Sequence, residues 1–257
     1  MDVTIIGSGN VATVMGRVLF ENGFTIRQVY SRDNSHAKQL AFVLQAEAIS
    51  DLAILDDQAD IYLIAVTDTA LPELTNKLSL KNKLVIHTAG SVSKHVLQLV
   101  STNYGVLWPM KMIRKSMIAI SPVTMVVDGS SESIIQEIEK LALVFSPVVT
   151  RADDMLRLKM HLLAAITSNF TNHLYHIATD YCDKEKIDFS LFYSIIEETA
   201  HRIQSSHPKE VQAGPAFRKD EETLKKHEQL LETYPGVLEL YRCMTESIQK
   251  SVGLTGF

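Results

Sequence analysis

The sequence predicts an α/β fold in which an N-terminal doubly wound Rossmann sheet is followed by an all-α C-terminal domain. Three observations predict it. An apolar run at residues 3–6 leads into a G-x-G-x-x-A motif, strand and helix patterns alternate up to about residue 150, and strand patterns stop after Arg151. We therefore expect a nucleotide-binding domain over residues 1–150 and a helical substrate and dimerisation domain over residues 151–257.

The glycine motif reads Gly7-Ser8-Gly9-Asn10-Val11-Ala12. In a Rossmann unit the first glycine permits a sharp turn, the second lets the backbone approach a pyrophosphate, and the third small residue brings the helix close to the sheet. A helix that begins near Asn10 would direct its free N–H groups and positive dipole end at the phosphates. We expect a dinucleotide to contact Gly7, Ser8, Gly9, Asn10 and Val11; the alternative is a glycine-rich turn in an unrelated α/β fold.

The end of the second predicted strand, residues 24–30, indicates which dinucleotide binds. An acidic residue there would accept a hydrogen bond from the ribose 2′-hydroxyl, whereas an arginine would favour a 2′-phosphate. Ser31 and Arg32 follow this strand, so we predict NADP(H) rather than NAD(H). Two alternatives stay open: a one-residue shift would bring Asp33 to the ribose, and Arg32 could be a solvated turn residue.

The remaining elements of the first half follow from apolar spacing and from turn and cap residues. The first helix has apolar residues at helical spacing up to Leu19 and a stop signal at Asn22-Gly23. Further strands are predicted at residues 47–49, 60–66, 83–87, 104–107, 123–127 and 148–150. Further helices are predicted at residues 36–44, from about Leu71 to Leu78, and at residues 93–101 and 131–145.

The second half reads as helices only. They are predicted at residues 153–182, 188–205, 220–232 and 237–252, and the domain boundary at residues 146–152. The first of these helices is long for a small domain, which makes it a candidate spine for packing. We expect a homodimer formed through the C-terminal helices. Ligands of such proteins lie in the cleft above the carboxyl ends of the strands.

Composition excludes several classes of function. The chain has 257 residues with 25 basic and 30 acidic side chains and a net charge of −5, so a nucleic-acid partner has no electrostatic support. Cys182 and Cys243 indicate neither a disulfide framework nor a metal site. No apolar stretch approaches the roughly 20 residues of a membrane helix, and the first strand leaves no room for a signal peptide. We therefore expect a cytoplasmic protein without a metal or a membrane partner.

Three loops at the carboxyl ends of later strands are expected to face the nicotinamide half of the cofactor. Val66 and Thr67 would lie along the ribose and pyrophosphate, although Asp68 or Thr69 could simply cap the next helix. The small residues Ala89 and Gly90 would let a planar ring approach the backbone, or could form an ordinary turn. Lys111, in the third loop, could meet an anionic substrate or be a surface lysine.

Candidate catalytic groups lie in the helical half. His161, Ser168 and Asn169 share one sector of the long helix at the α-helical period, where histidine could exchange a proton and asparagine could orient a carbonyl or amide group. An interface histidine with solvated amides is the alternative. Arg218 follows the rigid Gly214-Pro215 turn and precedes the predicted helix cap Asp220, so it could grip a carboxylate or phosphate. A structural ion pair of Arg218 is equally open.

At these residues the chain resembles a bacterial family of Rossmann-like proteins with a C-terminal helical domain of unknown function, often labelled NADP oxidoreductases of the deazaflavin-dependent type. The resemblance spans the whole chain. It is carried by Gly7–Ala12, by His87-Thr88-Ala89-Gly90-Ser91, by Lys159-Met160-His161 with Ser168-Asn169-Phe170, and by Gly214–Asp220 with His227. More distantly the layout is similar to pyrroline-5-carboxylate reductase, ketopantoate reductase and 6-phosphogluconate dehydrogenase, which implies a helical domain of the last type that supplies substrate groups opposite NADP(H).

Two positions depart from these relatives. The family usually has a histidine before the proline of the loop that here reads Trp108-Pro109, and tryptophan cannot transfer a proton. The Lys-x-x-x-Asn pair of the distant dehydrogenases is also missing, because Leu163 follows Lys159 at the fourth position. The resemblance therefore implies fold and cofactor more directly than reaction, and it leaves the involvement of a deazaflavin open.

The leading hypothesis is an oxidoreductase that moves a hydride between NADP(H) and a small carbonyl, imine or alcohol substrate, with an anionic substrate as one option. His161 would exchange the proton, Asn169 would orient the substrate and Arg218 would bind its anionic group. The alternative is a non-catalytic NADP(H) sensor. A short-chain dehydrogenase is excluded because no Tyr-x-x-x-Lys occurs, and phosphoryl transfer is unsupported because the chain lacks a G-x-x-x-x-G-K-[ST] loop.

Overall fold

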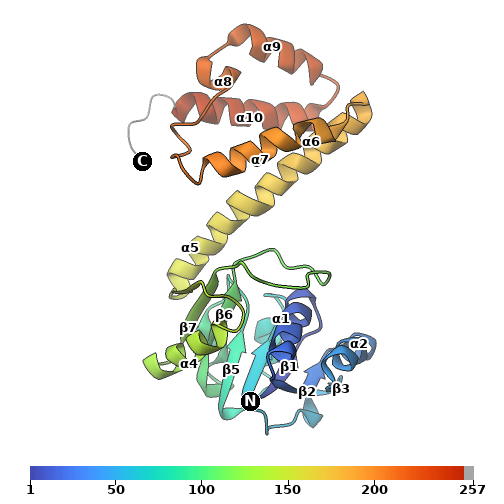
Figure 1. The fold of residues 1–257 in the computed structure, drawn as a ribbon, viewed down its shortest axis with the longest axis vertical. Helices are drawn as coiled ribbons and strands as arrows, with labels where there is room; N and C mark the ends of the chain where they lie inside the picture. The colour runs from blue at the N-terminus through green and yellow to red at the C-terminus, as the bar shows by residue number, and fades with distance from the viewer. Residues whose placement is uncertain (252–257) are drawn as a thin grey trace. The chain divides into compact units, whose positions relative to one another are not determined.

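The computed structural model describes residues 1–251. Their contacts divide the chain into two compact units, Met1–Ser168 and Asn169–Phe257, here called unit 1 and unit 2. Unit 1 contains all the strands of the sheet and the first helices, and unit 2 is helical (Figure 1). The last strand of the sheet ends at Arg151, next to the boundary predicted between residues 150 and 151. The division into domains 1–150 and 151–257 stays a prediction.

The sheet of unit 1 has eight strands in the order β3-β2-β1-β4-β5-β6-β7-β8. Strands β1 to β6 are parallel, whereas β7 runs antiparallel to β6 and pairs in parallel with β8. The strands are β1 Asp2–Ile6, β2 Thr25–Tyr30, β3 Glu47–Ile49, β4 Ile61–Ile64, β5 Lys81–His87, β6 Ser101–Pro109, β7 Met125–Gly129 and β8 Val149–Arg151. The first six follow the Rossmann order, which confirms the predicted doubly wound sheet.

Helices cover both faces of this sheet. They are α1 Asn10–Glu21, α2 Asn34–Leu44 and α4 Glu132–Ala142 on one face and α3 Leu71–Thr75 and η2 Lys94–Leu97 on the other. The short turn η1 Leu52–Ile54 follows β3, and α5 Asp154–Ala164 follows β8. One apolar core lies between the sheet and α1, α2 and α4, and a second lies on the opposite face beneath α3 and η2. Strand β4 shows the alternation, since Ile61 and Leu63 belong to the first core and Tyr62 and Ile64 to the second.

Side-chain caps define several helix starts. The carboxylate of Asp33 accepts hydrogen bonds from the first turn of α2, Ser131 caps α4, and Asp153 caps α5. The predicted helix over residues 93–101 is wrong. Only the short turn η2 forms there, because Ser101 already starts β6, which pairs with β5 on one side and β7 on the other.

Unit 2 continues the helical chain. Its elements are α6 Thr171–Glu185, η4 Phe189–Phe192, α7 Tyr193–Arg202, α8 Pro215–Arg218, α9 Glu221–Leu230 and α10 Pro235–Ser251. Asp220 caps α9 through its side chain, as predicted. The short helix α8 was not predicted. The last predicted helix was extended to Val252, which lies outside the described residues.

The predicted long helix forms as a continuous run of three elements, in which the π-helix η3, Ala165–Phe170, separates α5 from α6. A π-helix bonds residue i to i+5 and therefore has more residues per turn than an α-helix. The predicted grouping of His161 with Ser168 and Asn169 assumed the α-helical period, and this stretch does not keep that period. Within residues 1–251, none of the helices has the length and apolar character needed to span a bilayer.

Candidate active site

A cavity of about 700 Å³ opens at the carboxyl ends of the central strands in unit 1. It lies where β1 is flanked by β2 and β4, which is the switch point at which doubly wound sheets bind ligands. Nine of the predicted cofactor residues line it: Gly7, Ser8, Gly9, Asn10, Val11, Ser31, Arg32, Val66 and Thr67. The structure thus brings together segments from the ends of β1, β2 and β4.

The two glycines of the motif have different structural roles. Gly7 has φ of 130°, and a Cβ built on it would lie 2.2 Å from the carbonyl oxygen of Ala65, so no side chain fits. A Cβ on Gly9 would meet nothing within 4 Å. Gly7 is therefore required by the protein's own packing, whereas the empty space at Gly9 faces the cavity that it lines.

The N-terminus of α1 provides the anion-binding part of the cavity. Gly9 is its N-cap residue and supplies no side-chain hydrogen bond to the first turn, which leaves N–H groups available. The Asn10 amide oxygen accepts a hydrogen bond from the backbone of Lys115 at 3.3 Å, and the hydroxyl of Ser8 donates to that of Ser31 at 2.9 Å. The motif is thus tied both to the end of β2 and to the loop before β7.

The end of β2 distinguishes between the two cofactor alternatives. Arg32 is exposed and lines the cavity. Asp33 also borders it, but its carboxylate accepts hydrogen bonds from Ser35 and His36, which lower its pKa and engage it as the cap of α2. The carboxylate of Asp33 therefore caps the helix, while Arg32 is an exposed cation in the cavity lining. This geometry favours the 2′-phosphate over a bare ribose hydroxyl.

The loop after β4 does not form the alternative helix cap. Helix α3 begins at Leu71 after Ala70, with no side-chain cap, so the interpretation of Asp68 or Thr69 as its N-cap is wrong. Instead the carboxylate of Asp68 accepts a hydrogen bond from the hydroxyl of Ser91. This bond joins the loops after β4 and β5, which are two of the three loops predicted to face the nicotinamide.

Ala89 and Gly90 lie after β5, beside rather than within the lining of the cavity. The backbone N–H of Ala89 donates to Nδ1 of His87 at 3.2 Å. A Cβ on Gly90 would lie 2.6 Å from Cε2 of Trp108 and 2.7 Å from Cδ2 of His161. Glycine is thus needed here because two rings cover the loop closely.

His161 reaches this loop from α5. Its imidazole is half-buried and lies against the indole of Trp108, with ring centroids 5.7 Å apart. The candidate proton-exchanging group is therefore at the carboxyl edge of β5 and β6, within unit 1. The sequence predicts a role for His161 but not this contact, because nothing in a short-range pattern relates residue 161 to Trp108.

His87 belongs to one of the motifs shared with the family, but the sequence predicts no role for it. Its imidazole is fully buried, and its Nε2 has no hydrogen-bond partner among the described residues. Burial and then the positive charge of Arg157 lower the pKa of His87 to about 4. The imidazole is therefore neutral at physiological pH and accepts through Nδ1 from the loop that carries Gly90.

Two other predicted groups belong to unit 2. Asn169 is exposed in η3, and Arg218 is the exposed last residue of α8. Hydrogen bonds from Thr223, together with the charge of Arg218, lower the pKa of Asp220. Roles in substrate binding for Asn169 and Arg218 remain predictions. Lys111, in contrast, donates to the carbonyl groups of Ile120 and Pro122 and holds its own loop.

Comparisons with known proteins agree with this site. Residues 2–90 match the family model "NADP oxidoreductase coenzyme F420-dependent", and residues 123–248 match a domain of unknown function, DUF2520. A solved structure from Bacteroides fragilis, classed as an NADP oxidoreductase, is 33% identical over 97% of this chain and 98% of its own, with a TM-score of 0.90. The chain belongs to this NADP oxidoreductase family. No curated protein matches the sequence.

Membership of the family confirms the predicted class, an NADP-dependent oxidoreductase, and the predicted cofactor. Two more distant structures show the same fold. The 1-pyrroline-5-carboxylate reductase of Streptococcus pyogenes is 14% identical over 97% of this chain and 98% of its own, with a TM-score of 0.64. An imine reductase from Myxococcus stipitatus in complex with NADP+ is 14% identical over 98% and 93%, with a TM-score of 0.63.

Proposed function

We propose that this member of the family transfers a hydride between NADP(H) and a small carbonyl, imine or alcohol substrate at the carboxyl edge of β4 to β6. The observation that carries the proposal is the position of His161. A side chain able to exchange a proton lies on the Gly90 loop, and Asp68 and Ser91 link that loop to the one bordering the cofactor cavity. Hydride transfer to a polar double bond requires such a proton.

The residues of the cavity fit an NADP molecule. The open space at Gly9 and the uncapped start of α1 suit a pyrophosphate, and Arg32 suits a 2′-phosphate. Val66 and Thr67 continue the lining toward the Gly90 loop. The cofactor supplies the hydride when it is bound.

The protein's own residues bind the cofactor, orient the substrate and exchange a proton with it. Gly90 has no side chain in the space next to Trp108 and His161, so the imidazole can lie directly on this loop. His161 gives a proton to the substrate nitrogen or oxygen during reduction and takes it back during oxidation. In unit 2, Asn169 is proposed to orient the substrate and Arg218 to bind an anionic group, because Arg218 is exposed and follows a proline turn.

The test combines binding with turnover. Calorimetry should show NADPH binding, and the absorbance of NADPH should fall with members of a panel of keto acids, ketones and cyclic imines. His161→Ala should reduce kcat at least about 100-fold while NADPH binding stays within twofold, since His161 does not line the cofactor cavity. His201→Ala, which removes an exposed histidine of α7, is the matched control and should leave both unchanged. Tight NADPH binding without turnover of any substrate would favour a sensor.

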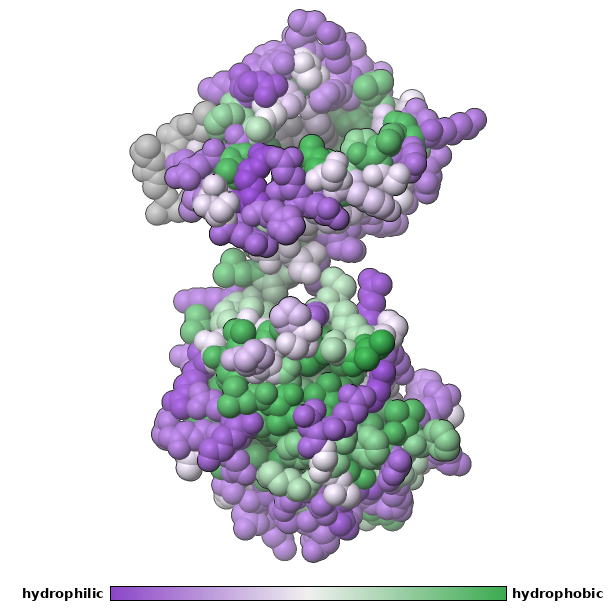
Figure 2. Space-filling view, viewed as in Figure 1, coloured by the Kyte–Doolittle hydropathy of each residue, from purple (hydrophilic) through white to green (hydrophobic). Residues whose placement is uncertain are grey.

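We also propose a homodimer, because α5 is apolar on the side opposite its buried residue Arg157. Met155, Leu158 and Leu162 share that side at helical spacing, and each is about half exposed or more. Apolar residues of unit 2 such as Ile195 are similarly exposed. Figure 2 shows hydrophobic residues, in green, on the surface of each unit. A second copy of this chain is the occupant we propose, since like helices can pair across a two-fold axis.

Light scattering should give the mass of a dimer. Leu158→Glu with Leu162→Glu should give a monomer, and Lys159→Ala, an exposed neighbour on the same helix, should leave the mass unchanged. The cytoplasm is the proposed compartment, supported by the two free thiols Cys182 and Cys243.

A further inference from the structure

Helix α5 has the reverse of the usual burial pattern. Its one buried residue is Arg157, whose side chain is 1% exposed, whereas Leu162 and Leu163 are each 58% exposed. Burial of an arginine is costly unless partners compensate for its lost hydration. The contacts of Arg157 should therefore show what determines the position of this helix.

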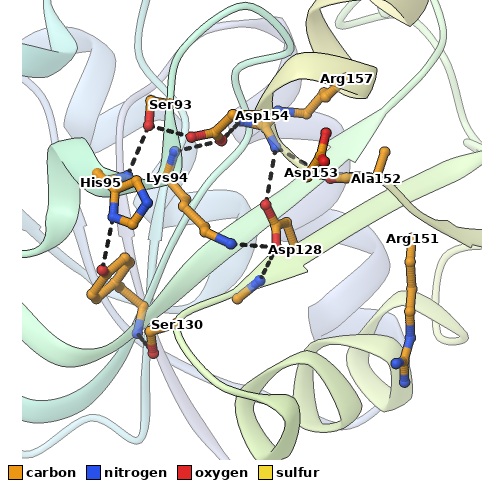
Figure 3. Close-up of polar contacts among 12 residues, drawn as sticks. Ser93, Lys94, His95, Asp128, Ser130, Arg151, Ala152, Asp153, Asp154 and Arg157 are labelled. Carbon is orange, nitrogen blue, oxygen red and sulfur yellow. Dashed lines mark hydrogen bonds and ion pairs between the residues drawn. The ribbon is translucent and has the colours of Figure 1, made fainter.

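The guanidinium of Arg157 joins α5 to two other segments (Figure 3). It donates to the carbonyl oxygen of Val92 at 2.6 Å and to the carboxylate of Asp154 at 2.5 Å, and it lies 3.7 Å from the carboxylate of Asp128. Val92 belongs to the loop that follows Gly90. Arg157 thus connects the start of α5 with that loop and with β7.

Asp128 and Asp154 are held from further sides. Nζ of Lys94 and the N–H of Gly129 donate to Asp128 at 2.7 and 2.8 Å. Burial alone would raise the pKa of Asp154, but hydrogen bonds from Ser93, from the backbone of Lys94 and from Arg157 hold it at about 2. The carboxylate of Asp154 is therefore charged at neutral pH and accepts hydrogen bonds from three sides.

The strand register relates this network to the Gly90 loop. His87 of β5 pairs with Val106 of β6, and Val106 pairs with Asp128 of β7, so the three lie in one row across the sheet. Trp108 is two residues further along β6, on the same face. Arg157 lies beside Asp128, and His161, four residues later on the same side of α5, lies against Trp108.

The buried ion pair of Arg157 is better explained by the position that it gives to α5 than by a gain in stability. Nε of Arg157 and Oδ2 of Asp128 are buried without a hydrogen-bond partner among the described residues, so the ion pair is incompletely compensated. Apolar pairs often stabilise such positions at least as well. A planar guanidinium, however, fixes both the height and the rotation of the helix that bears it, because its donors point in set directions.

We propose that Arg157 is the positioning residue of this active site: paired with Asp128 and bonded to Val92, it fixes α5 so that the imidazole of His161 lies over Gly90 and against Trp108. This inference rests on the proposed catalytic role of His161. Arg157 itself touches neither the cofactor cavity nor the reacting groups. Its effect passes through the helix to His161.

The chain contains a single tryptophan, so Trp108 fluorescence reports the His161 contact without any substrate. A protonated imidazole quenches a neighbouring indole, and the emission of the intact protein should therefore titrate with pH. His161→Ala should abolish that titration, which assigns it to His161 rather than to His87, the other imidazole near this loop. The charged groups of this region also include Asp68, Lys94, Asp128, Asp154 and Arg157, and all of them are unaltered in that variant.

The decisive variants are Arg157→Lys, which keeps the charge but loses the planar fork, and the double variant Arg157→Met with Asp128→Asn, which removes both charges of the most deeply buried pair. In both, the tryptophan titration should lose more than half its amplitude and kcat should fall at least about tenfold, with NADPH affinity within twofold. Arg157→Lys should retain more of each signal than the double variant. Arg151→Lys is the control, since Arg151 pairs with Glu132 and Glu139 outside this network.

The outcomes separate this inference from the proposed function. A folded Arg157→Lys protein with the titration and kcat of the wild type would overturn the positioning role. A parallel loss of NADPH affinity and melting temperature in both variants, with proportionate loss of kcat, would also overturn it and show a merely structural residue. If the wild type turns over no substrate, the proposed function fails, whereas the fluorescence titration still decides whether Arg157 sets the position of His161.

Discussion

The imidazole of His161 and the indole of Trp108 lie 5.7 Å apart and together fill the space that a side chain at residue 90 would need. Three segments distant in the sequence, the loop after β5, the end of β6 and helix α5, therefore meet at one point. Each of these segments limits the positions that the other two can take. A change at any of them should be felt at the proposed site of proton exchange.

Gly90→Ala should disturb this meeting point directly. The new methyl group would lie under 3.0 Å from both rings, and overpacking of this kind costs about 1–3 kcal/mol. We expect a lower melting temperature, a shifted Trp108 emission and a loss of kcat larger than the loss of NADPH affinity. Gly236→Ala, where a Cβ meets nothing within 4 Å, is the control. Unchanged emission and kcat in Gly90→Ala would contradict the close packing of the two rings on this loop.

Arg32→Ala should change cofactor selectivity. Because the guanidinium is the group proposed to bind the 2′-phosphate, NADPH affinity should fall about tenfold or more while NADH affinity stays within twofold. Calorimetry with both cofactors measures this. Lys38→Ala removes an exposed cation from the same region, on α2 but outside the cavity lining, and should affect neither. An equal loss for NADPH and NADH would show that Arg32 does not read the phosphate.

The two motif glycines should respond differently to alanine. Gly7→Ala places a methyl group 2.2 Å from a carbonyl oxygen at a positive φ and should prevent folding or strongly lower the melting temperature. Gly9→Ala should leave the melting temperature nearly unchanged, because its Cβ meets no protein atom, yet weaken NADPH binding about tenfold or more by obstructing the pyrophosphate. Thermal melts and calorimetry on both variants are sufficient. A Gly9→Ala protein that binds NADPH normally would place the pyrophosphate elsewhere.

The buried His87 should make the protein less stable in mild acid. Its pKa is about 4 in the folded state against 6.5 when unfolded, so between these values the unfolded chain binds a proton that the folded chain does not. Stability is fully present above pH 6.5 and falls as the pH decreases toward 4. From pH 7 to pH 5 the loss from this group is about 2 kcal/mol.

Urea unfolding at the two pH values measures this dependence. His87→Asn keeps an acceptor for the N–H of Ala89 and should flatten it, whereas His201→Asn, at an exposed position, should not. The carboxylate of Asp154, with its pKa of about 2, contributes only below about pH 4 and does not confuse the comparison. An identical pH dependence in the wild type and His87→Asn would rule out a protonation penalty at His87.

Much of the cofactor site was predictable because its residues are close together in the sequence. The motif from Gly7 to Val11 combines a turn, a helix start and an apolar strand, and each of these follows from rules that act over a few residues. The cap Asp220 was predictable for the same reason. Arg32 follows the second strand directly, so its place at the cavity could be inferred from the strand alone.

The elements that were missed depend on distant partners. The reversal of β7 follows from its pairing with β6, and the failure of the predicted helix at 93–101 follows from the long strand that begins at Ser101. The π-helix at Ala165–Phe170 breaks a period that the sequence pattern could not show to be broken. The burial of Arg157 could not be predicted from the sequence. An apolar pattern would place the neighbouring leucines of α5 inside and the arginine outside, and the structure shows the reverse.

The amino-acid order by itself determined the phosphate-binding turn, the alternation of strands and helices and the change to helices after the sheet, since local backbone preferences and apolar spacing suffice for these. Only the tertiary structure decided that Arg157 pairs with Asp128 and that His161 rests on Trp108. The physical reason is that such contacts depend on strand order and direction across the whole sheet, which brings together side chains that no short-range rule relates.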